Sequence, residues 1–358
     1  MRKAVLTSAA LALTILAGSA VEAEAQVTKF KIPDEQGAGQ PYPMEIATAP
    51  DGSVWFVEFY GNAITQMLPG GRFRRVQADS QQAGLTGVTV DAQGNVWATE
   101  SVANRIVKLG TNGRLTHYDV PTPNSRPGVI TVGPDGALWF SEVYGQNIGR
   151  LDPANGSIKE FPIVGRPENG IVSDEPYPKG ITTGPDGALW FCLGGWNAIG
   201  RLTVDGEMAI YPVPTENSGP YRIVTGGDGA LWFTELLGGK IGRITTGGAI
   251  TEFKTPQPVS GPRGIVAGPD GALYYAEGLG KKSIGRITTT GLFSDIAIPV
   301  SADEIRSLEL VGLYPSDPAG YPQGITFAPD GRIWATDNGT NKILMIDLGS
   351  KGALQVGE

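Results

Sequence analysis

A carboxylic acid recurs at the end of one predicted strand along most of the sequence. The acids are Glu58, Glu100, Glu142, Glu235, Glu277 and Asp337, and Leu193 alone breaks the series. Recurrence favours a structural role, in which each carboxylate accepts loop backbone N–H groups or pairs with a neighbouring repeat. The alternative is that two or three acids converge on a hard cation or a polar ligand. Glu277 and Glu235 are then the metal candidates, and the ion is Mg²⁺ or Ca²⁺, because carboxylates without histidine suit hard cations better than Zn²⁺.

A second set of polar side chains stands where other predicted strands begin. It consists of Glu45, Lys179, Arg222, Arg263 and Gln323, which we interpret as candidate ligand-binding residues. The three cations are explained less well by the repeat pattern than the acids are. They are therefore the best candidates for binding an anionic group. We expect a small molecule as ligand or substrate, and no organic cofactor.

The single histidine and the single cysteine have ordinary structural explanations. His117 lies in a predicted outer strand, residues 115–119, remote from the central channel. Cys192 occupies a slot that other repeats fill with small residues, so core packing accounts for it. One histidine leaves the chain almost without the commonest catalytic and metal-binding side chain, and one cysteine excludes a disulfide framework.

Composition and charge restrict the class of protein further. The chain has 358 residues, of which 41% are hydrophobic and 18% charged, with 52 Gly and 27 Pro. It is too apolar for a disordered chain and too rich in turn formers for a helical bundle. The net charge is −8, with no basic run beyond the first three residues. This charge argues against nucleic acid and anionic membranes as partners.

The first 25 residues have the pattern of an export signal. Two basic residues are followed by an apolar stretch at 4–17, and Ala23 and Ala25 place small side chains where signal peptidase reads them. We expect cleavage after Ala25. No later segment approaches the roughly 18 apolar residues that cross a bilayer. The expected product is a periplasmic or secreted monomer without a membrane span.

An internal repeat predicts the elements that position the polar residues. An Asp-Gly turn followed by a strand of the type Ala-Leu-Trp-Phe-x-Glu recurs along the chain, and the turn glycines are Gly52, Gly94, Gly136, Gly187, Gly229, Gly271 and Gly331. Their spacings are 42, 42, 51, 42, 42 and 60 residues, which is one unit of 42 with insertions of 9 and 18. Seven units predict a single all-β domain over residues 26–358, a seven-bladed β-propeller. A parallel β-helix competes, but its coils are usually shorter.

Each unit contains four short predicted strands, which suits a four-stranded antiparallel blade. In one unit the strands are residues 264–267, 272–277, 283–288 and 291–299. Residues 27–33 look like a fourth strand but precede the first Asp-Gly turn, so we expect them to complete the seventh blade and close the ring. Residues 353–356 compete for that place and rank second. The insertions, residues 164–177 and 300–321, are interpreted as rims or partial lids over one mouth of the ring, or else as ornamental loops.

Four motifs resemble the repeat of streptogramin B lyases, also called virginiamycin B lyases. They are Gly184-Pro-Asp-Gly-Ala-Leu-Trp-Phe191, Trp232-Phe-Thr-Glu235, Lys240-Ile-Gly-Arg-Ile244 and Ile250-Thr-Glu-Phe253, and the resemblance covers nearly all of residues 27–348. It implies the seven-bladed fold. In active members it also implies opening of a cyclic depsipeptide by elimination, in which a base removes the proton α to a carbonyl and Mg²⁺ stabilises the charge.

The residues that the resemblance assigns to catalysis are mostly replaced. The positions of the two histidines hold Arg263 and Tyr221, and an acidic position holds Gly261, whereas Glu277 matches. Arginine does not lose its proton in proteins and cannot be the base. Three hypotheses remain. The first is an exported enzyme with a rebuilt centre that acts on a cyclic ester, lactone or other small polar substrate, with Glu277 and possibly Glu235 on a divalent metal. The second is a non-catalytic propeller that binds a ligand or a protein through its mouth, and the third is carbon–oxygen lyase activity through a different base, for which Tyr221 is the candidate.

Overall fold

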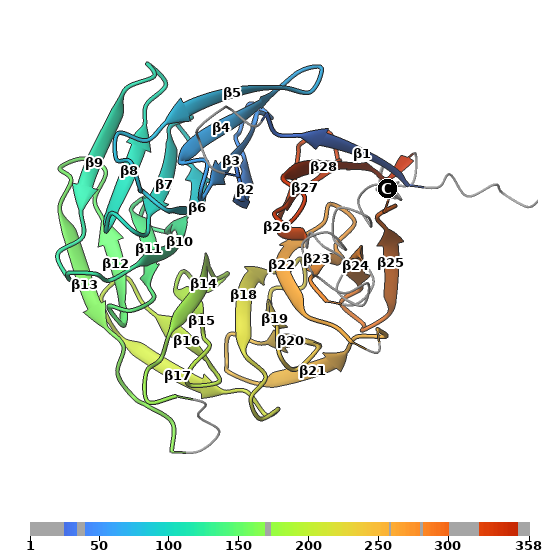
Figure 1. The fold of residues 1–358 in the computed structure, drawn as a ribbon. Helices are drawn as coiled ribbons and strands as arrows, with labels where there is room; N and C mark the ends of the chain where they lie inside the picture. Colours follow the sequence, from blue (N-terminus) through green and yellow to red (C-terminus); the bar gives the residue numbers. More distant parts are fainter. Residues whose placement is uncertain are drawn as a thin grey trace, which may run out of the picture.

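The computed structural model describes residues 25–33, 40–168, 173–257, 259–279, 282–300 and 322–349. Seven four-stranded antiparallel sheets form a ring around a central opening (Figure 1). The prediction of a seven-bladed β-propeller is therefore confirmed. Within the described residues, no helix is long and apolar enough to cross a membrane. The predicted signal peptide, apart from Ala25, and most of the second insertion lie outside the described residues.

The blades follow the chain in order, and each contributes its first strand to the centre of the ring. In blades 1 to 7 the first strands are β2 (Pro43–Thr48), β6 (Leu85–Val90), β10 (Pro127–Val132), β14 (Pro178–Thr183), β18 (Pro220–Thr225), β22 (Pro262–Ala267) and β26 (Pro322–Phe327). The second strands are β3 (Val54–Glu58), β7 (Val96–Glu100), β11 (Leu138–Glu142), β15 (Leu189–Leu193), β19 (Leu231–Glu235), β23 (Leu273–Glu277) and β27 (Ile333–Asp337).

The outer half of each blade consists of a third and a fourth strand. The third strands are β4 (Ala63–Leu68), β8 (Arg105–Leu109), β12 (Asn147–Leu151), β16 (Ala198–Leu202), β20 (Lys240–Ile244), β24 (Ser283–Ile287) and β28 (Lys342–Asp347). The fourth strands are β5 (Arg72–Gln77), β9 (Leu115–Asp119), β13 (Ile158–Pro162), β17 (Met208–Pro212), β21 (Ile250–Lys254), β25 (Phe293–Ala297) and, in blade 7, β1 (Gln26–Lys31).

The second strands supply the core between blades. Every residue of these strands is buried, and neighbouring aromatics point to opposite faces of the sheet. In blade 3, Trp139 packs in the cluster shared with blade 4, whereas Phe140 packs in the cluster shared with blade 2. In the five blades that have an aromatic pair, the pair can thus fill two inter-blade spaces, as the sequence predicts, whereas blades 2 and 7 have alanine as the second residue.

The N-terminal strand closes the ring. β1 pairs antiparallel with β28 over six registered residues, from Gln26 opposite Asp347 to Lys31 opposite Lys342. Directly after β1, Ile32 is fully buried. The predicted closure is confirmed, and the competing residues 353–356 lie outside the described residues.

A three-residue unit stabilises the turn between the first and second strands of blades 3 to 5. In blade 3, Asp135 accepts a hydrogen bond from the Trp139 indole at 2.9 Å and one from the Arg150 guanidinium at 2.6 Å. The guanidinium carbon lies 5.9 Å from the centre of the indole ring. Burial opposes ionisation of Asp135, but these two hydrogen bonds hold its pKa below the ordinary value. Blade 6 builds the same unit with Tyr274 in place of tryptophan. We call it the Asp–aromatic–Arg unit.

Candidate functional site

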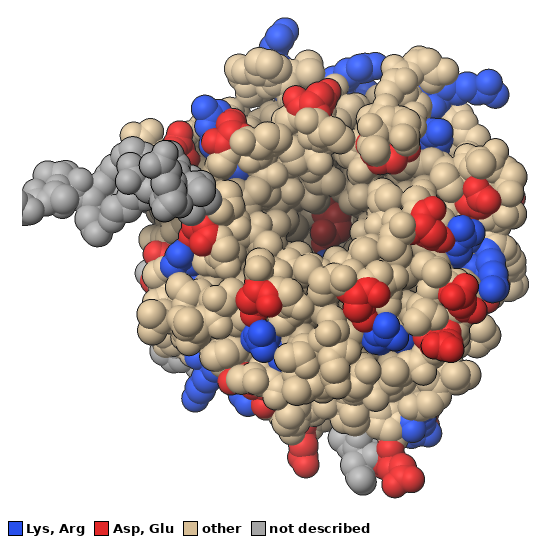
Figure 2. All heavy atoms as spheres, turned by 180° about the vertical axis from the view of Figure 1, so that it is seen from behind, with Lys and Arg blue, Asp and Glu red and all other residues tan. Residues whose placement is uncertain are grey.

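The candidate ligand-binding residues all lie in the same irregular two-residue segment of their blades, Lys179, Arg263 and Gln323 at its first position and Glu45 and Arg222 at its second. In every blade the pairing of the first and second strands slips after the first residue. In blade 5, Pro220 pairs with Glu235 and Ile223 pairs with Phe233, which leaves Tyr221 and Arg222 in the slip. A β-bulge changes the direction in which side chains point. The slipped residues of the first strands therefore form a ring of side chains at one end of the channel, which we call the channel mouth. The channel itself is visible as a central hollow in Figure 2, with acidic atoms in its depth.

Hydroxyl side chains of the second strands hold these bulges in place. Thr234 accepts a hydrogen bond from the Arg222 backbone N–H at 3.1 Å and donates one to the Arg263 carbonyl of the next blade at 2.8 Å. Thr336 makes the equivalent contacts with Gly324 and with Met44. Sequence reasoning treated this slot as core packing and missed its role. The hydroxyls at positions 99, 141, 234 and 336 were the available signal.

An ion pair between blades 1 and 5 crosses the channel mouth. The Arg222 guanidinium donates through both Nε, at 3.1 Å, and Nη2 to one oxygen of Glu45. The side chains are 12% and 15% exposed, so water screens the pair only partly. Burial works against the charged form, but the Glu45 carboxylate raises the pKa of Arg222. These residues lie 177 positions apart in the chain, and only the closed ring brings them together.

A chain of hydrogen bonds links blades 5, 6 and 7 at the same level. Arg263 Nη1 donates to Gln323 Oε1 at 2.8 Å, and Gln323 Nε2 donates to the Tyr221 hydroxyl at 2.7 Å. The Arg222 guanidinium lies 4.6 Å from the centre of the Tyr221 ring. The Tyr221 hydroxyl oxygen therefore accepts a hydrogen bond, and the Arg222 cation lies over the Tyr221 ring.

Lys179 completes the channel mouth from blade 4. Gly180, the next residue, brings β14 so close to β18 that a Cβ there would lie 2.7 Å from Arg222 Cα. Only glycine fits this approach, which places Lys179 beside Arg222. Burial, and then the charge of Arg222, lower the pKa of Lys179. Among the described residues, Lys179 has no hydrogen-bond or ion-pair partner.

The structure thus brings the five predicted ligand-binding residues and Tyr221 to one site. Three of these residues are cations, and Glu45 is the only acid among the six. The cluster is locally positive in a chain whose net charge is −8.

The contacts of the six recurring acids agree with the structural role that the sequence favours. All six acids are at least 98% buried, and most are bound by their own blade or the next one. Glu58 binds Arg75 at 2.6 Å, Glu100 binds Arg105 at 2.6 Å, and Asp337 binds Lys282 of the neighbouring blade at 2.6 Å. In blade 4 the exception, Leu193, lies in an apolar cluster with Ile210 packed against it.

Three acids of the series have strongly shifted pKa values. Burial raises the pKa of Glu142 to about 8, with the nearby Glu160 adding to the effect. Burial and Glu252 likewise raise the pKa of Glu235 to about 8. Glu277 reaches about 7 through burial, although hydrogen bonds from Ser260 and the Gly261 N–H oppose the rise.

The described surroundings of Glu277 and Glu235 offer few of the ligands that the predicted Mg²⁺ or Ca²⁺ would need. Such ions take about six or more oxygen ligands from carboxylates, carbonyls and water. No group of three or more Asp, Glu, His or Cys side chains in the described part of the chain could hold a metal. Glu277 already accepts a hydrogen bond at 2.6 Å from the Ser260 hydroxyl. We therefore derive no chemical step through a metal, and a metal at these residues stays a prediction.

Stability should depend on pH through these acids. A carboxyl whose pKa rises on folding binds its proton more strongly in the folded state, so the unfolding free energy decreases as pH rises between the two pKa values. For Glu235 this window runs from 4.5 to about 8. We expect the melting temperature to fall by several degrees from pH 5 to pH 8, and the Glu235→Gln variant to show a smaller fall. The exposed Glu207→Gln is the control, and an unchanged slope in the Glu235 variant would refute the assignment.

The single histidine and the single cysteine lie at the positions that the sequence predicts for them. His117 lies in β9, with Nε2 3.6 Å from Glu100 in the same blade. Cys192 is fully buried, and burial raises the pKa of its thiol.

The end of the first insertion packs on the loop after β15, where the Trp196 indole donates to the Asp174 carbonyl at 3.0 Å. Whether either insertion acts as a lid stays a prediction.

Fold and channel mouth together define a seven-bladed β-propeller with a cluster of charged side chains at one end of its axis. A model of the virginiamycin B lyase family matches residues 25–311. The chain belongs to this family, and the resemblance inferred from the sequence is confirmed.

Two solved structures are similar over nearly the whole chain. A streptogramin B lyase structure is 34% identical, covers 90% of this chain and 97% of its own, and has a TM-score of 0.78. A catalytically inactive histidine-to-alanine variant of virginiamycin B lyase from Staphylococcus aureus, solved with quinupristin, is 33% identical, covers 90% of this chain and 99% of its own, and has a TM-score of 0.76. The virginiamycin B lyase of Bordetella pertussis is 46% identical over 61 residues, which span 17% of this chain and only 18% of that protein.

Proposed function

We propose that this propeller binds a small polar or cyclic-ester-derived ligand at the channel mouth, through an anionic or electron-rich oxygen of that ligand. Lys179 carries the proposal, because it is a partly buried cation beside another cation and has no partner within the described residues. Like charges in one site cost free energy unless something compensates them. A bound carboxylate or enolate oxygen would supply that compensation.

The other side chains of the channel mouth support the same ligand class. Glu45 already neutralises Arg222, and Gln323 orients the Arg263 guanidinium by accepting one of its N–H groups. Arginine presents several N–H donors in a fixed plane, which suits a planar anion. Lys179 and Arg263 would therefore each offer N–H donors to such an anion.

We propose further that the chain does not use the elimination machinery of its relatives. Arg263, Tyr221 and Gly261 stand where the family resemblance places two histidines and an acid. The replacement exchanges groups that accept a proton for groups that bind an anion. Catalysis on a lactone or other small polar substrate, and binding without catalysis, both remain compatible with this site.

A second candidate is carbon–oxygen lyase activity through a different base. The observation that favours it is the lowered pKa of Lys179, which increases the fraction of neutral amine near pH 7. The neutral amine would take the proton α to a carbonyl as the electron pair expels the ester oxygen. This candidate predicts product formation, which simple anion binding does not.

A matched pair of probes tests the proposed binding. We expect 6-hydroxyhexanoate to bind saturably in an NMR titration, and its neutral lactone, ε-caprolactone, to bind more weakly. Lys179→Met should weaken binding of the anion by about ten- to a hundredfold, since a charge-assisted hydrogen bond contributes about 1.5–3 kcal/mol. Affinity should also fall as pH rises and Lys179 loses its proton.

The control for Lys179→Met is Lys108→Met, because Lys108 lies over the Trp97 ring in blade 2 and takes no part in the channel mouth. Equal affinity of the Lys179 variant and the unmodified protein would refute the proposal. Release of crotonate from β-butyrolactone, in which the ester oxygen is bonded to the carbon β to the carbonyl, would favour the lyase candidate instead.

A further inference from the structure

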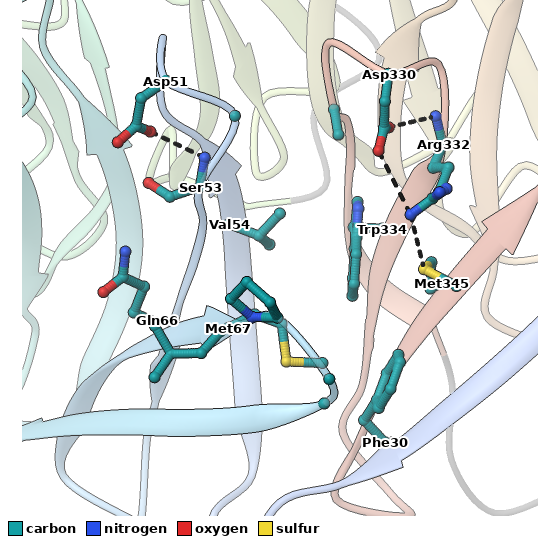
Figure 3. Close-up of a pocket in the computed structure, with 16 residues that line it drawn as sticks. Phe30, Asp51, Ser53, Val54, Gln66, Met67, Asp330, Arg332, Trp334 and Met345 are labelled. Carbon is teal, nitrogen blue, oxygen red and sulfur yellow. Dashed lines mark hydrogen bonds and ion pairs between the residues drawn. The ribbon is translucent and has the colours of Figure 1, made fainter.

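A cleft of about 560 Å³ lies between blades 7 and 1, where β1 closes the ring (Figure 3). Its lining comes from the turns after the first strands and from the third strands, at the end of the blades opposite the channel mouth. Phe30 and Trp334 form an aromatic wall, with their ring centres 5.9 Å apart. Asp51 and Asp330 stand on opposite sides of the cleft (Figure 3). We call this space the seam cleft.

The cleft exists because two arginines of the repeat are missing. The third-strand residue that pairs with the tryptophan is Arg150 in blade 3, and it covers the indole and binds the turn aspartate. The equivalent residue is Gln66 opposite Trp55 in blade 1, and Met345 opposite Trp334 in blade 7. Every other blade has a cation at this position, which is Lys108, Arg150, Arg201, Arg243 or Arg286. The two neutral residues are thus neighbours in the ring and flank the cleft.

The acidic and aromatic partners of the missing arginines remain in the cleft. Asp51 is exposed and accepts the Ser53 backbone N–H at 2.9 Å, and within the described residues it has no ion pair. Trp334 is 91% buried, yet its indole N–H has no hydrogen bond to a described residue, whereas the Trp139 indole binds its turn aspartate. The blade 7 and blade 1 units are therefore Asp–aromatic–Arg units without their arginine.

Arg332 replaces the missing guanidinium only in part, because it pairs with Asp330, the turn aspartate of blade 7, but does not lie over the Trp334 ring. It lies at the rim, 43% exposed, with its guanidinium 3.5 Å from Asp330 and 3.7 Å from Asp347. One cation thus faces two carboxylates there, and the exposed Asp51 lies across the cleft from them.

We propose that the seam cleft binds a small molecule bearing an alkylguanidinium group. The ligand's guanidinium would lie against the Trp334 and Phe30 wall and donate to Asp51, while its alkyl chain contacts Met67 and Val54. Stacking on an aromatic ring and a bond to a turn aspartate are the two contacts that the repeat arginine makes within one blade in blades 3 to 6, whereas here the ring belongs to blade 7 and the aspartate to blade 1. A planar cation stacked on an indole and bound to a carboxylate gains from both interactions.

Butylguanidinium and its neutral isostere butylurea provide a direct test. In a titration followed by the Trp334 indole ¹H–¹⁵N signal, we expect saturable binding of butylguanidinium and binding of butylurea at least tenfold weaker. Asp51→Asn should weaken butylguanidinium binding about tenfold. The exposed Asp205→Asn should leave it unchanged.

Restoring the missing arginine gives a second, independent test. Met345→Arg should place a guanidinium over Trp334, raise the melting temperature and abolish butylguanidinium binding. Should that variant not fold, Asp51→Asn alone decides the question. Equal affinity for the two probes, or undiminished binding in Asp51→Asn, would overturn the proposal.

Discussion

Deletion of residues 26–33 is expected to lower the melting temperature far more than deletion of residues 352–358. The first deletion removes β1, and with it every backbone hydrogen bond that β1 makes to β28. It also removes Ile32, which is fully buried, and the contact of Phe30 with Trp334. Truncating one buried isoleucine costs about 2–5 kcal/mol, a large part of the stability of a typical domain. The exposed edge of β28 should in addition promote aggregation.

The two truncated proteins are compared by calorimetry and by size-exclusion chromatography. A milder variant, Ile32→Ala, keeps the strand but loses its buried side chain and should give an intermediate melting temperature. Indistinguishable melting temperatures for the two truncations would contradict closure by β1.

The fold could be predicted because the residues of each repeat determine the local structure of that repeat. Asp-Gly supplies the positive φ of a hairpin turn, as at Gly136 with φ of 75°, and the following aromatic pair must have an apolar neighbour on both faces. Seven such units of nearly equal length leave few architectures. Closure of the ring by β1 was predictable because this strand precedes the first Asp-Gly turn and has no other strands of the same blade next to it in the sequence.

The positions of the site residues could be predicted, but their pairings could not. Placing Lys179 and Arg222 at one mouth needed only the repeat register. The ion pair of Arg222 with Glu45 depends on the diameter of the closed ring and on the bulge that directs both side chains, and neither is a local property of the sequence. The Asp–aromatic–Arg unit could have been predicted from the sequence, since its three residues recur at fixed spacing. Its residues do not by themselves indicate ligand binding, and only the absence of the arginine from two neighbouring blades does.

Incubation of this protein with streptogramin B and Mg²⁺ is expected to give little or no linear product. Elimination needs a group that is unprotonated near pH 7 and within hydrogen-bond reach of the proton α to the carbonyl. An arginine side chain does not lose its proton in proteins, so Arg263 cannot be this group, and Gln323 accepts one of its N–H groups. Loss of a positioned base typically reduces the rate by about 10² to 10⁴.

Four variants measured alongside the unmodified protein separate the possible bases. Ring opening is followed by mass spectrometry, with Lys108→Met as the control. We expect Arg263→His alone to recover little activity, because Tyr221 and Gly261 still occupy the other altered positions and the hydroxyl of Tyr221 is held by Gln323. If the unmodified protein turned over efficiently, our interpretation of the channel mouth as an anion site without a base would be wrong. Activity lost in Lys179→Met but kept in Tyr221→Phe would then identify the lysine amine as the base, and the reverse pattern would identify the tyrosine.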